Sequence, residues 1–351
     1  MKTKLLRGIR GAGGAVCMVI LALLVGAILV VISGNHPLEA YGAMLSGAFA
    51  SKQRISELFV KLIPITIMAL GVSIAYKAQM WNIGAEGQFV MGAIASTAVA
   101  LYVPLPTVLL MPLSLVVAIA AGALWAGFAG WLKVRFHANE VITTLMLNYI
   151  ATYFLAFLIY GPMMDTEGQL PQSQILPEAV RLNPLMEDLR IHSGIFLLLL
   201  VIVLMCFLWK STLGYRIDLI GQGESVATYA GIHVNRTMVT TMMLSGALAG
   251  LAGWIEIFGV QFRLMEGIAG GYGNIATVIA LLGGLIPLGI VVSAFFFSIL
   301  LVGGASMQRM TEVPYSIVDV IQGLIIVFVI ARAVFQFSDG KERVKRGKKH
   351  A

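Results

Sequence analysis

The chain has 351 residues, of which 59% are hydrophobic and only 12% are charged. Soluble domains carry about 25% charged residues, so this chain lacks the charge needed to cover a water-facing surface, and a soluble globular protein is excluded. Its net charge of +7 comes without interleaved aromatic and basic residues, which argues against a nucleic-acid partner. Membrane lipid is the expected solvent for most of the exterior.

Ten apolar stretches are predicted to cross the membrane, because each approaches the ~20 helical residues that span a hydrocarbon core about 30 Å thick. In chain order they are residues 14–33, 58–75, 84–103, 107–132, 141–160, 194–209, 238–258, 268–285, 288–304 and 316–334. The first follows a basic N-terminus, as a signal peptide does. It exceeds the usual apolar region of about 7–15 residues and no A-x-A cleavage site follows, so we expect an uncleaved helix.

The count of ten depends on Pro287, which divides the long apolar region 268–304 into two spans. Lys and Arg gather in alternate connecting segments and in the tail, which is the bias expected for cytoplasmic loops. With a single span at 268–304, the basic tail would lie outside. We therefore expect an all-α, polytopic helical bundle with both termini in the cytoplasm, although one span could be re-entrant. We expect a single transmembrane domain, with a cytoplasmic N-terminus at 1–13, a membrane bundle at 14–335 and a basic cytoplasmic tail at 336–351 that meets anionic lipid.

Small residues recur at spacing four within two of these spans, a pattern that lets helix backbones approach closely in lipid. The rows are Gly122, Ala126 and Gly130, then Gly246 with Gly250, and Ala249 with Gly253. Packing within one subunit is the favoured interpretation, and a dimer interface is the alternative.

A polar cluster lies at the entry to the third predicted span, where Asn82, Glu86 and Gln88 stand between glycines. Polar groups inside a membrane are costly and are candidates for function, and irregular backbone is tolerated where it lines a protein cavity. We expect these side chains to belong to the solute path. The alternative for Glu86 is a carboxylate at a helix start, favoured by the helix dipole.

A second cluster begins the fifth predicted span, where Glu140, Thr144 and Asn148 form one polar stripe on a helix face. It is assigned to the same path, with the helix-start alternative kept for Glu140. Glu256 and Asp319 are isolated acids near span ends, and an interfacial role is favoured for both.

The inward loop 209–236 is expected to contain a short helix at 225–230 that ends in a glycine at its C′ position. Such a helix could dock on a cytoplasmic partner. The residues assigned to this loop are Gly221, Gln222, Glu224, Ala227, Ala230 and Gly231.

The chain carries no recognisable catalytic or metal-binding pattern. Its two cysteines lie in apolar runs, and its five histidines are scattered. It has no G-x-x-x-x-G-K-[ST] phosphate loop, so it cannot hydrolyse ATP alone, and we expect neither an enzyme nor a bound cofactor.

Four segments carry a resemblance to a known family: 81–88 (WNIGAEGQ), 139–149 (NEVITTLMLNY), 230–232 (AGI) and 271–283 (GYGNIATVIALLG). With these, the chain resembles the permeases of ATP-binding-cassette (ABC) importers for branched-chain amino acids, simple sugars and nucleosides. It is most similar to the nucleoside, guanosine-type branch. The resemblance runs from about residue 58 to the last helix.

The resemblance implies a multi-pass permease of the bacterial plasma (inner) membrane. Its implied partners are cytoplasmic ABC ATPases that use ATP, a second permease subunit and an extracytoplasmic solute-binding protein. After Leu282 the nucleoside branch usually has an Arg-Asn-Asn-like turn, whereas this chain has a glycine pair, so a simple-sugar (ribose-like) permease is the alternative. An ion-coupled secondary transporter is less favoured, because no convincing inverted repeat is found and the acids cluster near helix ends.

Overall fold

The computed structural model describes residues 2–166, 168, 170–311, 313–329 and 331. Regular structure in these residues is helical, apart from isolated β-bridges around the segment between α6 and α7. The predicted basic tail at 336–351 lies outside the described residues. The helices are α1 (Lys2–Ile32), α2 (Pro37–Phe49), α3 (Lys52–Lys77), α4 (Ala85–Tyr102), α5 (Thr107–Phe136), α6 (Glu140–Ile159), α7 (Gly194–Leu208), α8 (Thr212–Gln222), α9 (Glu224–Tyr229), α10 (Val234–Glu256), α11 (Tyr272–Leu282), α12 (Pro287–Thr311) and a last helix at Ser316–Val329, with a 3-10 turn at Glu178–Val180 and a π-helical turn, η2, at Ile257–Gln261.

Each of the ten predicted spans overlaps one of these helices, although α11 covers only Tyr272–Leu282 of the span predicted at 268–285. Among the described residues, five helices are long and apolar enough to cross a membrane, or up to seven if each bent pair is one span. The five are α3, α5, α6, α10 extended by η2, and α12. The all-helical fold is therefore confirmed, whereas ten crossings and the orientation stay predictions.

The break predicted at Pro287 is present. Helix α11 ends at Leu282 and α12 begins at Pro287, while Gly284 and Leu285 adopt left-handed backbone angles of φ 64° and 58°. Because α11 has only 11 residues, it extends about 16 Å, which is half of a hydrocarbon core. The re-entrant alternative therefore applies best to this segment.

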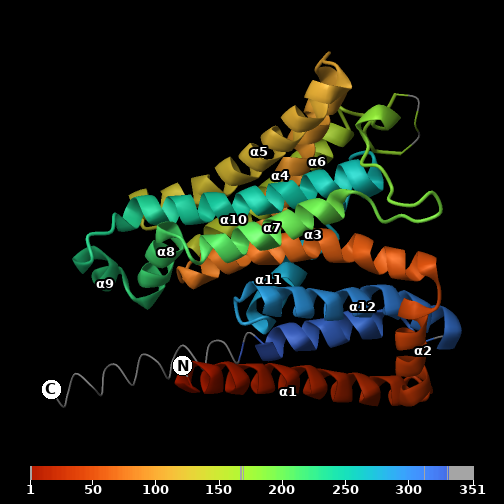
Figure 1. The fold of residues 1–351 in the computed structure, drawn as a ribbon. Helices are drawn as coiled ribbons and strands as arrows, with labels where there is room; N and C mark the ends of the chain where they lie inside the picture. Colours follow the sequence, from red (N-terminus) through yellow and green to blue (C-terminus); the bar gives the residue numbers. More distant parts are fainter. Residues whose placement is uncertain (1, 167, 169, 312, 330, 332–351) are drawn as a thin grey trace.

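The long helices lie side by side, and the short helices α2, α8 and α9 mark the two ends of the bundle (Figure 1). The beginning of α1 lies at the same end as α8 and α9. Helix α2 and the segment between α6 and α7 lie at the opposite end. We call these the α9 end and the α2 end.

The small-residue rows bring helices of this one chain together. A Cβ on Gly122 would collide with the carbonyl oxygen of Gly246, and one on Gly250 with that of Ala118, so α5 and α10 pack backbone to backbone. A Cβ on Gly253 would collide with the Phe89 carbonyl of α4. The within-subunit interpretation of these rows is confirmed, because the contacts are made inside the chain.

Helix α2 was not predicted, because its 13 residues are too few to span a membrane. It is bent by 115° from the last part of α1, with Pro37 at its first position, where a missing N–H costs nothing. Glycines again allow close packing: a Cβ on Gly47 would collide with Ser306, and one on Gly303 with the Met44 carbonyl. Thus α2 is anchored on α12.

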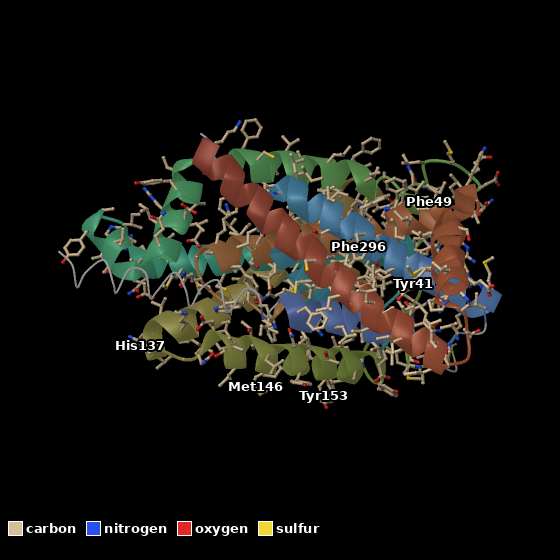
Figure 2. All side chains as sticks on the ribbon, turned by 90° about the horizontal axis from the view of Figure 1, so that it is seen from below. Tyr41, Phe49, His137, Met146, Tyr153 and Phe296 are labelled. Atoms are coloured by element: carbon tan, nitrogen blue, oxygen red, sulfur yellow. The ribbon has the colours of Figure 1, made fainter. Side chains whose placement is uncertain are left out.

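The outer faces of α5 and α6 carry large exposed apolar side chains. In α6, Met146 and Tyr153 point away from the bundle (Figure 2), and Tyr153 is 72% exposed. Such a surface is typical of helices in contact with lipid or with another membrane subunit.

Candidate functional site

Helix α4 begins inside the bundle and not at its end. After α3 ends at Lys77, residues 78–84 turn back along it. The depth of this turn is shown by Ser245 of α10, which contacts both segments. Its carbonyl oxygen packs against Gly71 of α3, and its hydroxyl accepts a hydrogen bond from Asn82 at 2.9 Å. Asn82 thus lies level with Gly71, six residues before the end of α3, or about 9 Å back into the bundle. An interior helix start leaves backbone N–H groups that need partners.

Asn82 and Gln88 satisfy each other at this helix start. Asn82 Nδ2 donates to Gln88 Oε1 at 3.1 Å, and Gln88 Nε2 donates to Asn82 Oδ1 at 2.9 Å. Both side chains are buried, and Asn82 Oδ1 also accepts from the backbone N–H of Gly84 at 3.0 Å. The pair makes a closed polar contact, so its desolvation is compensated.

Asn148 of α6 caps α4 from a neighbouring helix. Its Oδ1 accepts from the backbone N–H of Gly87, at the third position of α4, at 2.8 Å, and its Nδ2 donates to the Ile83 carbonyl at 2.9 Å. Thr144 Oγ1 accepts from the backbone N–H of Ile83 at 3.3 Å. Two residues of the predicted stripe, Thr144 and Asn148, therefore fix the junction between α3 and α4, which we call the α4 junction (residues 80–88).

Glu86 lies where two helices begin. It occupies the second position of α4, and the backbone of Gly271, the N-cap of α11, hydrogen-bonds its carboxylate. A Cβ on Gly273 would lie only 2.7 Å from Glu86 Cβ. Because both helix N-termini carry partial positive charge, a carboxylate between them is stabilised.

Glu140 lies apart from the other predicted path residues. It begins α6 near the α9 end and forms an ion pair with Lys133 of α5 at 2.7 Å. With Glu224 of α9 it lines a small cavity of about 320 Å³ between the α5–α6 turn, α9 and the start of α10. The structure thus brings Asn82, Gln88, Thr144 and Asn148 together and separates Glu140 from them.

A larger cavity, of about 620 Å³, opens near the α2 end between α3, α11, α12 and the end of α10. Charged side chains line it. Lys61 of α3 donates to the hydroxyl of Tyr272 at 2.6 Å, and Glu256 is 1% exposed, with one carboxylate oxygen accepting from Gln261 at 3.0 Å. We call it the outer cavity.

Sequence reasoning missed the outer cavity. Lys61 was passed over inside an apolar run, and Glu256 was assigned an interfacial role. Lys61 and Tyr272 are 211 residues apart, so no local pattern joins them. One signal was available: Glu256 directly precedes a glycine-containing stretch that forms the π-helical turn η2 and ends in Gln261, and such turns are frequent at functional sites.

The predicted short helix of the inward loop is present as α9. Gly231 has φ 74°, its N–H donates to Thr228, and the Ile232 N–H donates to Ala227, which is the Schellman ending. Ala227 is buried, whereas Glu224 and Ala230 are exposed. Gln222, also exposed, donates to Asp218 at 3.1 Å.

Gly221 connects this loop to the bundle. A Cβ there would collide with the carbonyl oxygen of Lys77, so α8 packs directly on the last turn of α3. The Lys77 amine also lies 4.1 Å from the ring centre of Trp209. In the described part of the chain, no group of three metal-ligating side chains could hold a metal ion.

Residues 54–330 match the model of the family described as branched-chain amino acid transport system / permease component. The chain belongs to this permease family. The match covers α3 through the last described helix, so it includes the α4 junction, the outer cavity and α9.

Curated relatives cover nearly the whole permease. A glucose ABC transporter permease protein of Haloferax volcanii is 35% identical over 92% of this chain and 88% of its own length. A guanosine ABC transporter permease protein of Bacillus subtilis is 33% identical, over 93% and 95%. A nucleoside ABC transporter permease protein of Lactococcus lactis is 31% identical, over 91% and 90%. The chain is thus a multi-pass permease subunit of an ABC transporter, a transport component and not an enzyme.

Proposed function

We propose that this permease imports nucleosides as part of an ABC importer. The proposal rests on the 33% and 31% identity to guanosine and nucleoside permeases over almost the full length. A glucose permease at 35% identity supports a second candidate, import of a simple sugar. Both solutes are uncharged and rich in hydroxyl groups.

The test is uptake by cells that lack their own nucleoside and glucose importers and that express the complete transporter. Uptake of labelled guanosine, with no uptake of labelled glucose or ribose, is the expected result. Uptake of a sugar without guanosine would replace the nucleoside assignment by the second candidate. The same cells without the permease supply the background.

We further propose that α9 docks on a cytoplasmic ABC ATPase, which supplies the ATP hydrolysis that this chain cannot perform. Tyr229 is 94% exposed and Val226 is 46% exposed on this short helix, and an exposed aromatic beside an apolar residue is typical of a contact surface. Gly221 places α8 on α3, and α3 also carries Lys61 of the outer cavity. Motion imposed at α9 would therefore be transmitted along α3.

A charge within the α9 surface tests this docking. Ala230→Glu should reduce co-purification of the ATPase and uptake in proportion, because it places a carboxylate in the contact. Ala179→Glu is the matched control, since Ala179 is exposed in the segment between α6 and α7 at the other end. Normal ATPase binding by the Ala230 variant would leave α9 as a simple connector.

The remaining assignments follow from this one. We propose ten crossings in a single permease domain, cytoplasmic termini, a location in the bacterial plasma membrane, a second permease subunit and an extracytoplasmic binding protein. The α9 end is then cytoplasmic and the outer cavity faces the binding protein. We propose that the predicted path residues of the α4 junction lie beside the solute path without lining it. Glu86 packs against Gly273, and the preceding residue, Tyr272, lines the outer cavity.

A further inference from the structure

The outer cavity contains charges of both signs that do not neutralise each other directly. Glu256 is buried, and its second carboxylate oxygen, Oε2, has no hydrogen-bond partner. Lys61 contacts Tyr272 instead, by the 2.6 Å hydrogen bond and by lying 5.2 Å from the centre of its ring. No ion pair joins Lys61 to Glu256 among the described residues. A buried carboxylate oxygen without a donor is costly, so this geometry suits a donor that arrives from outside.

The surrounding walls supply hydrogen-bonding groups of both kinds. Besides Lys61 and Glu256, the lining includes Arg54 and Glu57, and Glu57 pairs with Arg190 at 2.9 Å. A lysine amine binds a hydrogen-bond acceptor, and a carboxylate oxygen without a partner binds a donor. A hydroxyl group can be either, so the two groups together suit a solute that carries several hydroxyls.

The backbone next to Glu256 is held in an unusual form. The π-helical turn η2 follows it directly, and Phe262, the residue after the turn, has a left-handed φ of 59°. Gln261, at the end of this turn, reaches back to Glu256. Residues held in sparsely populated conformations cluster at functional sites, and this turn orients the carboxylate that borders the cavity.

We propose that the outer cavity is a transient binding site for an uncharged polyhydroxylated solute. Glu256 Oε2 accepts from a solute hydroxyl, and the Lys61 amine donates to a solute oxygen. The inference rests on the proposed function, in which this solute is a nucleoside whose ribose hydroxyl meets Glu256. Its volume of about 620 Å³ lies within the range of small-molecule sites, about 300–1,000 Å³.

The experiment measures uptake of labelled guanosine by the complete transporter, with and without unlabelled 2′-deoxyguanosine and 3′-deoxyguanosine as competitors. The variants are Glu256→Gln and Lys61→Met. Glu39→Gln, an exposed acid at the start of α2, is the matched control. We expect KM to rise about tenfold in each cavity variant. We also expect Glu256→Gln to discriminate less between guanosine and at least one deoxy analogue. Competition ratios do not depend on how much permease reaches the membrane.

Unchanged KM and unchanged competition ratios in both cavity variants would overturn the inference, whatever their abundance. If Glu256→Gln fails to accumulate, Lys61→Met and Tyr272→Phe still decide the matter through KM. A parent that imports glucose and not guanosine would refute the nucleoside assignment alone. The same variants, assayed for uptake of labelled glucose with unlabelled 2-deoxyglucose as the competitor, would then test the cavity.

Discussion

Removal of the Asn148 side chain should destabilise the permease without changing how it binds its solute. Asn148→Ala deletes two hydrogen bonds at the α4 junction, from the Gly87 N–H at 2.8 Å and to the Ile83 carbonyl at 2.9 Å. It leaves that N–H, one of the first four of α4, without its partner in a bundle where water is scarce.

The expected loss can be bounded from these contacts. Side-chain hydrogen bonds inside membranes contribute about 0.6 kcal/mol on average and about 1.7 at most, so two bonds contribute about 1–3 kcal/mol. An unsatisfied buried donor adds about 1 kcal/mol or more. We therefore expect a loss of about 2–4 kcal/mol. Thr144→Val should cost less, about 1 kcal/mol, because the one bond that it removes between elements is longer, at 3.3 Å, and the other bonds of the hydroxyl, to the carbonyls of Glu140 and Val141, lie within α6.

The assay is unfolding of the purified permease by SDS in mixed micelles, which gives free energies, together with KM for uptake by the same variants. Asn183→Ala, at an exposed asparagine between α6 and α7, is the control and should match the parent. The expected order of destabilisation is Asn148, then Thr144, then Asn183. If Asn148→Ala unfolds like the parent but raises KM, the side chain contacts solute and the scaffolding role is wrong.

Three further predictions concern packing, pH and topology. Gly122→Leu should prevent accumulation of folded permease, since the leucine side chain would collide with the backbone of α10. Gly42→Ala, in open space on a helix, should be neutral or stabilising. Fluorescence-detected gel filtration measures the amount of folded permease for each variant. Burial, and secondarily the charge of Arg190, lowers the pKa of His192 to about 4. An unfolded histidine has a pKa of about 6.5, so between pH values of about 6.5 and about 4 the unfolded chain binds a proton that the folded chain does not. The free energy of unfolding therefore falls as the pH drops through this window, by up to about 3 kcal/mol. His192→Gln should show a flatter pH dependence of the SDS unfolding midpoint, and an equal slope in both proteins would contradict this. A reporter fused after Lys349 should be active only in the cytoplasm, and extracytoplasmic activity would refute the ten-span topology.

The sequence by itself determined the membrane class and the positions of the long helices. The length of an apolar stretch is a local property of the sequence, so each predicted span corresponds to a helix in the structure. Turn chemistry is local too. Pro287 predicted the break before α12, and Gly231 predicted the end of α9, because a proline suits the first position of a helix and a glycine readily adopts a left-handed conformation. Small residues at spacing four likewise predicted close packing, and the structure showed that the contact lies within the chain.

Only the tertiary structure decided what the polar residues do. Asn82 bonds to Ser245 of α10, and Asn148 of α6 bonds to the backbone of Gly87 in α4. Both bonds depend on how far residues 78–84 turn back along α3 and on the rotation of α6 and α10. Glu256 reads in sequence as an acid near a span end, yet it is buried beside the outer cavity with Lys61 on another wall. Such pairings are set by the packing of whole helices. A carboxylate or amide in sequence is therefore equally compatible with an interface, a helix cap or a solute path until the helices are in place.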